Sequence, residues 1–174
     1  MQTLQSGETF PKQTVARVGG GELVLGEPGG GHDWQMVVVY RGLHCPLCKK
    51  YLGQLEEIQG KYHALGVDVV AVSGDPEDKA QAFVDEVGLS FPVGYGLTED
   101  QMHALGVFVS NPRSPQETDR PFAEPGVFVI NGEGLLHIVD ISNAPFARPD
   151  LEALVGGLEF VRGNDYPIRG TRAA

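Results

Sequence analysis

Two cysteines, Cys45 and Cys48, carry the clearest chemical signal in this 174-residue chain, which contains no others. Their spacing on one helical turn would bring the sulfur atoms within bonding reach. A disulfide closing so short a loop restricts the unfolded chain little, so a structural staple is an inefficient use of this spacing. The pattern favours thiol redox chemistry over a zinc site or an inert buried pair. Zinc usually takes four ligands, which one pair and five scattered histidines match poorly.

The elements around the pair should make it reactive. An apolar, β-branched run at 36–40 predicts a buried central strand, and a helix is expected to start near Cys45 and Pro46. Proline suits a first helical turn, and the unpaired N–H groups there stabilise a thiolate and lower its pKa. His44 could lower that pKa when charged or carry the proton, unless it is an ordinary exposed loop residue. Lys49 could add positive potential but is more often a solvated helix residue.

The rest of the chain alternates strands and helices. Buried runs and β-branched positions predict the strands, while apolar positions at helical spacing and caps at Asp75, Thr98 and Asp150 predict the helices. Strands are expected at 13–18, 22–25, 36–40, 67–72, 91–93, 126–130 and 135–141, with an extended piece at 107–109 and a surface loop at 111–125. Helices are expected at 45–66, 75–87, after Thr98, and at 151–161. This order predicts a single α/β domain, 1–174, with an N-terminal hairpin extension at 1–35 and an irregular tail at 163–174.

Composition limits the functional classes. The formal net charge is −10, and no basic stripe of the kind that binds nucleic acid is visible. The acidic balance also argues against an anionic membrane surface, and no apolar run is long enough to span a bilayer. The N-terminus lacks the pattern of a signal peptide. We therefore expect no nucleic-acid or membrane partner, a cytoplasmic location and no cofactor.

The residues around the pair resemble those of the thioredoxin superfamily, and more closely its peroxiredoxin-like branch, known as the alkyl hydroperoxide reductase/thiol-specific antioxidant or redoxin family. The aromatic-Arg-Gly run at 40–42 leads into a Cys-Pro-x-Cys pair, as in many members, and the resemblance covers roughly residues 5–168. It implies a thioredoxin-like mixed sheet flanked by helices, and a cis-proline at Pro125 that faces the pair. Glu124 and Pro125 would then border the disulfide and offer backbone groups to a partner.

The chain departs from the peroxiredoxin pattern at two places. Cys48 occupies the position of the peroxide-attacking cysteine, and Cys45 replaces the usual threonine. The position of the arginine that normally stabilises the thiolate holds Pro125, so Arg41 or Arg120 would have to substitute. These departures favour thiol–disulfide exchange, in which Cys45 attacks first and Cys48 resolves. The alternative is peroxide reduction, in which Cys48 attacks and Cys45 resolves.

The resemblance also implies the partners. They are a disulfide or hydroperoxide substrate and a thiol reductant of the thioredoxin or glutathione type. If the protein reduces peroxides, the resemblance also implies an antioxidant role. Members of this branch often form dimers, so a homodimer is a family-level expectation.

Overall fold

The computed structural model describes residues 4–172. Residues 1–3 of the expected N-terminal extension and 173–174 of the expected tail lie outside the described part. The chain forms the following elements in order: β1 (Gln13–Arg17), β2 (Glu22–Leu25), β3 (Trp34–Val39), α1 (Pro46–Ala64), β4 (Val67–Val72), α2 (Glu77–Val87), β5 (Val93–Tyr95), α3 (Glu99–Ala104), β6 (Val109–Ser110), β7 (Phe122–Ala123), β8 (Gly126–Ile130), β9 (Leu136–Ile141) and α4 (Leu151–Gly163).

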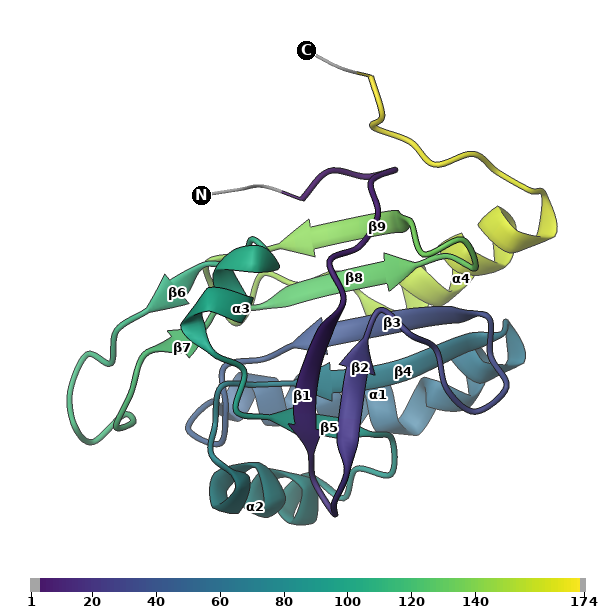
Figure 1. The fold of residues 1–174 in the computed structure, drawn as a ribbon. Helices are drawn as coiled ribbons and strands as arrows, with labels where there is room; N and C mark the ends of the chain where they lie inside the picture. Colours follow the sequence, from purple (N-terminus) through teal and green to yellow (C-terminus); the bar gives the residue numbers. More distant parts are fainter. Residues whose placement is uncertain (1–3, 173–174) are drawn as a thin grey trace.

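In the described residues, one mixed sheet has the strand order β2-β1-β5-β4-β3-β8-β9 (Figure 1). The two central strands β3 and β4 run parallel, which requires the α1 crossover between them. On the other side β3 pairs antiparallel with β8, and β8 pairs antiparallel with β9 across the hairpin. The β1–β2 hairpin joins through β5, so it extends the central sheet. The expected mixed sheet flanked by helices is confirmed.

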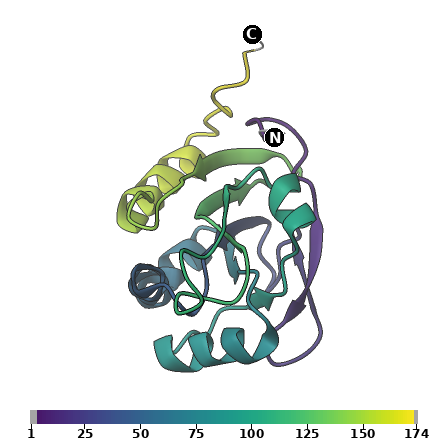
Figure 2. The same cartoon turned by 90° about the vertical axis from the view of Figure 1, so that its left-hand side faces the viewer.

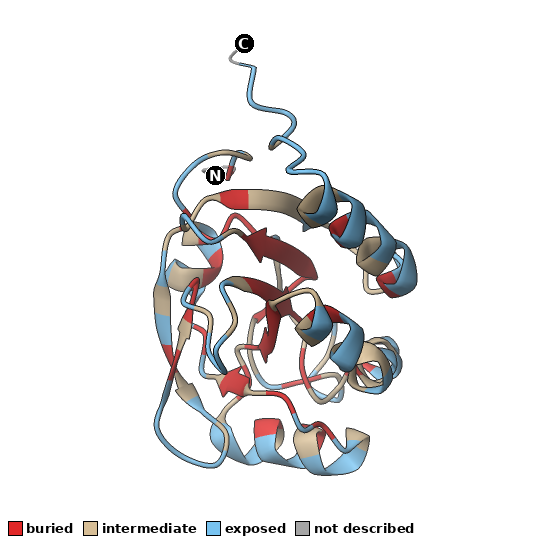
Figure 3. Cartoon of the chain, turned by 90° about the vertical axis from the view of Figure 1, so that its right-hand side faces the viewer, coloured by how far each residue is buried: buried red, intermediate tan, exposed pale blue. Residues whose placement is uncertain are grey.

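Helices cover the two faces of the sheet unequally. Apolar residues of α1, α2 and α4 pack with one face of β3, β4 and β8, and α3 packs on the other face with the N-terminal segment and the hairpin. Figure 2 shows these layers edge-on, and Figure 3 shows the buried strands between helices with exposed outer sides. A short loop connects the C-terminal end of β3 to the start of α1, where the cysteine pair lies.

Three of the predicted element boundaries and loops differ clearly from the structure. The strand expected at 91–93 is β5, two residues later, because Pro92 has no N–H and contributes only its carbonyl, which accepts from the N–H of Ala71. The loop expected at 111–125 contains β7, which pairs with β6. The final helix continues to Gly163, so the irregular tail begins one residue later than predicted.

Among residues 4–172, no helix combines the length and apolar character needed to cross a bilayer. The same residues contain no cluster of three or more His, Cys, Asp or Glu side chains arranged to hold a metal ion.

Candidate active site

Cys45 is the N-cap residue of α1, and Pro46 occupies the first turn of that helix. The Sγ atom of Cys45 accepts a hydrogen bond from the backbone N–H of Cys48 at 3.2 Å. Both cysteines are unpaired thiols, with 2% and 0% of their surfaces exposed. The structure thus places the pair at the helix start that the sequence predicts, facing the positive end of the helix dipole.

The two thiols have opposite acidities. The pKa of Cys45 is lowered from 9.0 to about 6. A hydrogen bond from the Cys48 side chain contributes most to this lowering, followed by the Cys48 backbone N–H and the charges of Arg148 and Arg41, against the opposing effect of burial. Burial raises the pKa of Cys48, and its role as donor to Cys45 raises it further. At neutral pH Cys45 is therefore the thiolate and Cys48 the thiol that stabilises it.

Arg148, which the sequence analysis missed, contacts the inner cysteine. It lies in the segment between β9 and α4, and its Nη2 donates to Sγ of Cys48 at 2.7 Å. Its guanidinium lies 4.8 Å from the centre of the Tyr51 ring, whose hydroxyl donates to the backbone carbonyl of Pro149 at 2.8 Å. The Nε and Nη1 atoms of Arg148 are buried without a hydrogen-bond partner in the described residues. The site therefore holds a cation whose hydrogen-bonding capacity is only partly used.

Arg41 and Arg120, the two candidates for the arginine that stabilises the thiolate, both form ion pairs with carboxylates. Arg41 forms an ion pair with the buried Glu124, Nε to Oε2 at 3.1 Å, and stacks on the Phe122 ring at 4.6 Å. Glu124 also accepts from the hydroxyl of Ser110 at 2.7 Å. Arg120 forms an exposed ion pair with Asp119 at 2.8 Å. Arg41 thus reaches Cys45 only through its charge, and the arginine on a sulfur atom is Arg148.

The expected cis-proline is wrong, because the bond between Glu124 and Pro125 is trans. The trans form of an X–Pro bond is intrinsically favoured, and this segment is also anchored within the fold. The N–H of Glu124 donates to the carbonyl of Phe108 at 2.8 Å, and the carbonyl of Pro125 accepts from the N–H of Ser142 at 3.0 Å. These two backbone groups are therefore not free to pair with a partner's chain.

His44 is partly buried against the ring of Phe122, with the ring centres 4.6 Å apart. Burial, followed by the charge of Arg41, lowers its pKa below the usual 6.5. A neutral imidazole cannot supply the positive charge that would lower the pKa of Cys45, so proton transfer is the role that stays a prediction. Lys49 forms an ion pair with Glu86 at 2.9 Å.

Asp75 does not cap α2, as the sequence suggested; the N-cap residue is Pro76. The carboxylate of Asp75 is instead buried and accepts from the backbone N–H of Leu43 at 2.7 Å. Gly42 has φ +137°, and a Cβ there would lie 2.6 Å from Oδ1 of Asp75. Asp75 and Gly42 therefore fix the loop that delivers Cys45 to the helix start.

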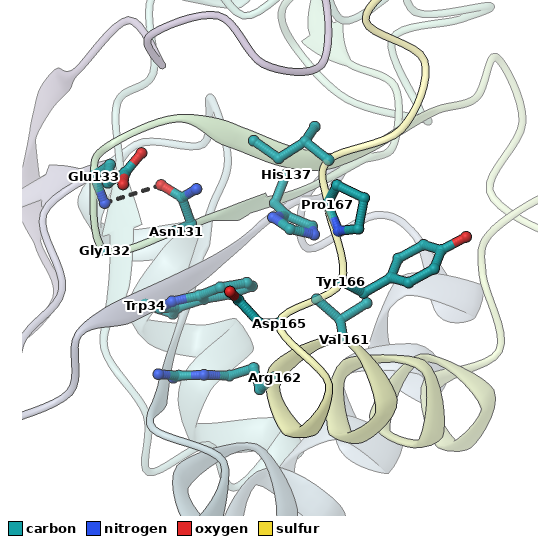
Figure 4. Close-up of a pocket in the computed structure, with 11 residues that line it drawn as sticks. Trp34, Asn131, Gly132, Glu133, His137, Val161, Arg162, Asp165, Tyr166 and Pro167 are labelled. Atoms are coloured by element: carbon teal, nitrogen blue, oxygen red, sulfur yellow. Dashed lines mark hydrogen bonds between the residues drawn. The ribbon is translucent and has the colours of Figure 1, made fainter.

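Hollows lie both beside the pair and far from it. A hollow of about 540 Å³ is at the opposite end of β3 (Figure 4). There the Arg162 guanidinium lies 4.8 Å from the centre of the Trp34 ring, and the tilted ring of His137 lies 4.9 Å from it, centre to centre. Neither cysteine lines this hollow or the two described next. Two smaller hollows, of about 320 and 440 Å³, lie on either side of Arg148. Access to the reactive pair is therefore expected from the Arg148 side.

Comparisons with known proteins agree with this chemistry. The family model described as "AhpC/TSA family" matches residues 6–139. The thiol-disulfide oxidoreductase ResA of Halalkalibacterium halodurans is 42% identical over 67 residues, 38% of each chain. ResA of Bacillus anthracis is 29% identical over 107 residues, 61% of this chain and 60% of the relative. The chain thus spans about two fifths to three fifths of the length of these curated relatives.

Solved structures of low sequence identity share the fold. A peroxiredoxin-like protein from Aquifex aeolicus superposes with a TM-score of 0.76 at 20% identity, covering 92% of this chain and 90% of that one. AhpC of Mycobacterium bovis superposes with a TM-score of 0.76 at 14% identity, covering 99% and 100%. Together with the family match, the relatives support a thiol-based redox function of the oxidoreductase class, compatible with both exchange and peroxide reduction.

Proposed function

Because the chain belongs to the AhpC/TSA family, we propose that it is a thiol–disulfide oxidoreductase in which Cys45 is the attacking thiol. The observation that carries the proposal is the position of Cys45 at the start of α1, where its Sγ accepts from the backbone N–H of Cys48 at 3.2 Å. The contacts with Cys48 and the positive charges nearby lower the pKa of Cys45 and favour its thiolate. Cys48 is a poor first nucleophile, since burial and its bond to Cys45 raise its pKa. The matched segments of the ResA relatives support the same chemistry.

The geometry gives a complete two-step reaction. The Cys45 thiolate attacks one sulfur of a substrate disulfide, forming a mixed disulfide and expelling the other sulfur as a thiolate. The negative charge that held the proton of Cys48 is then gone, so the Cys48 thiol can lose that proton. The Cys48 thiolate attacks Sγ of Cys45, forms the internal disulfide and releases the second substrate thiolate. Two electrons leave the dithiol and reduce one substrate disulfide to two thiols.

Trapping of the mixed disulfide tests the order of attack. A Cys48→Ser protein should hold a small disulfide covalently on Cys45, because the resolving sulfur is absent. The matched Cys45→Ser protein should form little or no adduct at pH 7, because burial, the largest cause of the raised pKa of Cys48, persists without Cys45. Intact-mass spectrometry measures both. A stable adduct in Cys45→Ser but not in Cys48→Ser would overturn the proposal.

Peroxide reduction is a second candidate, favoured by the contact of Arg148 Nη2 with Sγ of Cys48 at 2.7 Å. In that reaction the Cys48 thiolate breaks the O–O bond and becomes a sulfenic acid, and one oxygen leaves as water or alcohol. The Cys45 thiolate then displaces hydroxide, which takes a proton, and the internal disulfide forms. Equimolar hydrogen peroxide and the reduced protein distinguish the candidates. Disulfide formation within seconds supports peroxide reduction, and loss of thiol over many minutes or hours excludes it.

The proposal also covers the electron donor, the cellular location and the oligomeric state. We propose a thiol reductant of the thioredoxin or glutathione type as the electron donor, a cytoplasmic location, and a homodimer. Reduction of the internal disulfide by each candidate reductant, followed by intact mass, tests the first of these. The native mass of the purified protein tests the last.

A further inference from the structure

One of the hollows beside Arg148 has cationic and apolar walls. It lies between α1 and the segment before α4, with a volume of about 320 Å³, and we call it the Lys50 hollow. Its lining includes Leu47, Lys50, Tyr51, Phe146, Arg148 and Asp150. Since Arg148 also contacts Sγ of Cys48 and Leu47 lies between the two cysteines in the chain, the hollow opens beside the reactive pair.

The charges around this hollow favour an anion. Lys50 is exposed and makes no ion pair within residues 4–172, whereas its neighbour Lys49 is paired with Glu86. Arg148 has two buried nitrogen atoms without a partner, so no carboxylate neutralises its charge within the described residues. The carboxylate of Asp150 caps α4 by accepting from the N–H of Ala153 at 2.8 Å. Its negative charge leaves the lining, with Lys50 and Arg148, at a net charge of +1. On a chain of net charge −10, two incompletely paired cations beside the reactive thiols form a local exception.

The walls of the Lys50 hollow also expose apolar side chains to solvent. Phe146 is 80% exposed and Leu47 is 43% exposed, and the two line the same hollow. Tyr51 contributes an aromatic face on which Arg148 already stacks. A ligand with an apolar or aromatic body and a carboxylate would bury the body against these side chains and pair the carboxylate with Lys50. The positive charge of Arg148 nearby would add to the attraction.

We propose that the Lys50 hollow selects the substrate, and that the preferred substrate is a small organic disulfide with a carboxylate on an apolar or aromatic body. The inference rests on the proposed function, because the substrate held in the hollow presents to Cys45 the disulfide that its thiolate attacks. The carboxylate takes no part in electron transfer; it increases the rate of mixed-disulfide formation by holding the substrate beside the pair.

Two chromogenic disulfides test this selection. The dianionic dithiobis(nitrobenzoate) and the neutral dithiodipyridine each release a coloured thiol as they oxidise the reduced protein, and stopped-flow absorbance gives both rate constants. Each constant is divided by that of a small free thiol, which removes the intrinsic reactivity of the reagent. The corrected ratio of anionic to neutral rate should exceed one, despite the negative charge of the protein.

The Lys50→Gln variant should lower this ratio about two- to fivefold, the range expected for losing one exposed charge interaction. Lys49→Gln is the matched control, since it removes the same charge from the neighbouring residue, whose side chain is paired with Glu86. Its ratio should stay close to that of the wild type. Added salt should lower the wild-type ratio more than that of Lys50→Gln. An equal ratio in the wild type and Lys50→Gln would overturn the inference. If neither disulfide oxidises the reduced protein, the proposed function itself is contradicted.

Discussion

The acidity of Cys45 predicts how the stability of the reduced protein depends on pH. The pKa of this thiol is about 6 in the folded protein against an ordinary value of 9.0. Between these values the unfolded chain holds a proton that the folded protein has released, so the free energy of unfolding rises with pH. This contribution is fully present above pH 9 and is lost as the pH falls through 6.

The magnitude follows from the shift. Three pKa units correspond to about 4 kcal/mol as an upper bound, and solvent screening at the edge of the site reduces the expected gain to about 2–3 kcal/mol. Cys45→Ser isolates it, because serine is a good N-cap residue that keeps the helix start but does not titrate in this range. Titrating groups outside the cysteine pair contribute equally to both proteins and cancel in the difference.

Urea denaturation under a phosphine reductant, from pH 5.5 to 8.5, measures the difference. The upper limit avoids the range in which Cys48 matters, since its raised pKa makes the folded state lose stability only as the pH rises above 9. About two thirds of this contribution falls between pH 6 and 8.5, so over that range the wild type should gain about 1.5–2 kcal/mol over Cys45→Ser. Parallel pH dependences in the two proteins would refute the assignment of the thiolate to Cys45.

Three substitutions give further expected outcomes. Gly42→Ala should cost about 1–3 kcal/mol in urea denaturation, because its φ of +137° is strained for alanine and a Cβ would lie 2.6 Å from a carboxylate oxygen; Gly60→Ala, a helical site with nothing within 4 Å, should be neutral or stabilising, and equal costs at both sites would contradict the reasoning. Arg148→Met should raise the pKa of both thiols, because a positive charge beside them is lost, and thiolate absorbance against pH measures this; an unchanged titration would mean that the guanidinium contact does not persist in solution. Glu124→Ala should destabilise the fold by about 3 kcal/mol by leaving Arg41 without its partner, and thermal unfolding should show a smaller loss for the double variant Arg41→Met/Glu124→Leu.

Local sequence signals predicted most of the scaffold. The apolar run at 36–40 became the central strand β3, and Cys45 became the cap of α1. Thr98 and Asp150 cap the helices that follow them, and Gly88 ends α2 in the left-handed conformation. Each of these features depends on residues within a few positions of one another, so the sequence carries the physical cause directly.

The missing parts of the site depend on distant contacts. Arg148 reaches Cys48 from 100 residues away, because α4 packs on α1 and brings the preceding segment over the pair. Nothing local marks it; the only sequence signal was its position just before a predicted helix cap. Asp75 was assigned to a cap for the same reason: its true partner, the N–H of Leu43, lies 32 residues earlier. Pro125 was assigned a cis bond by resemblance, and its own backbone contacts hold it trans.

Selective alkylation tests the central claim, that Cys45 is the attacking thiol. Reduced wild-type protein is exposed briefly to a limiting amount of iodoacetamide at pH 7, and peptide mass spectrometry locates the adduct. The account predicts modification at Cys45, with an apparent pKa near 6 when the rate is followed against pH. Modification chiefly at Cys48 would contradict the account, and would identify the thiol beside Arg148 as the one that reacts first.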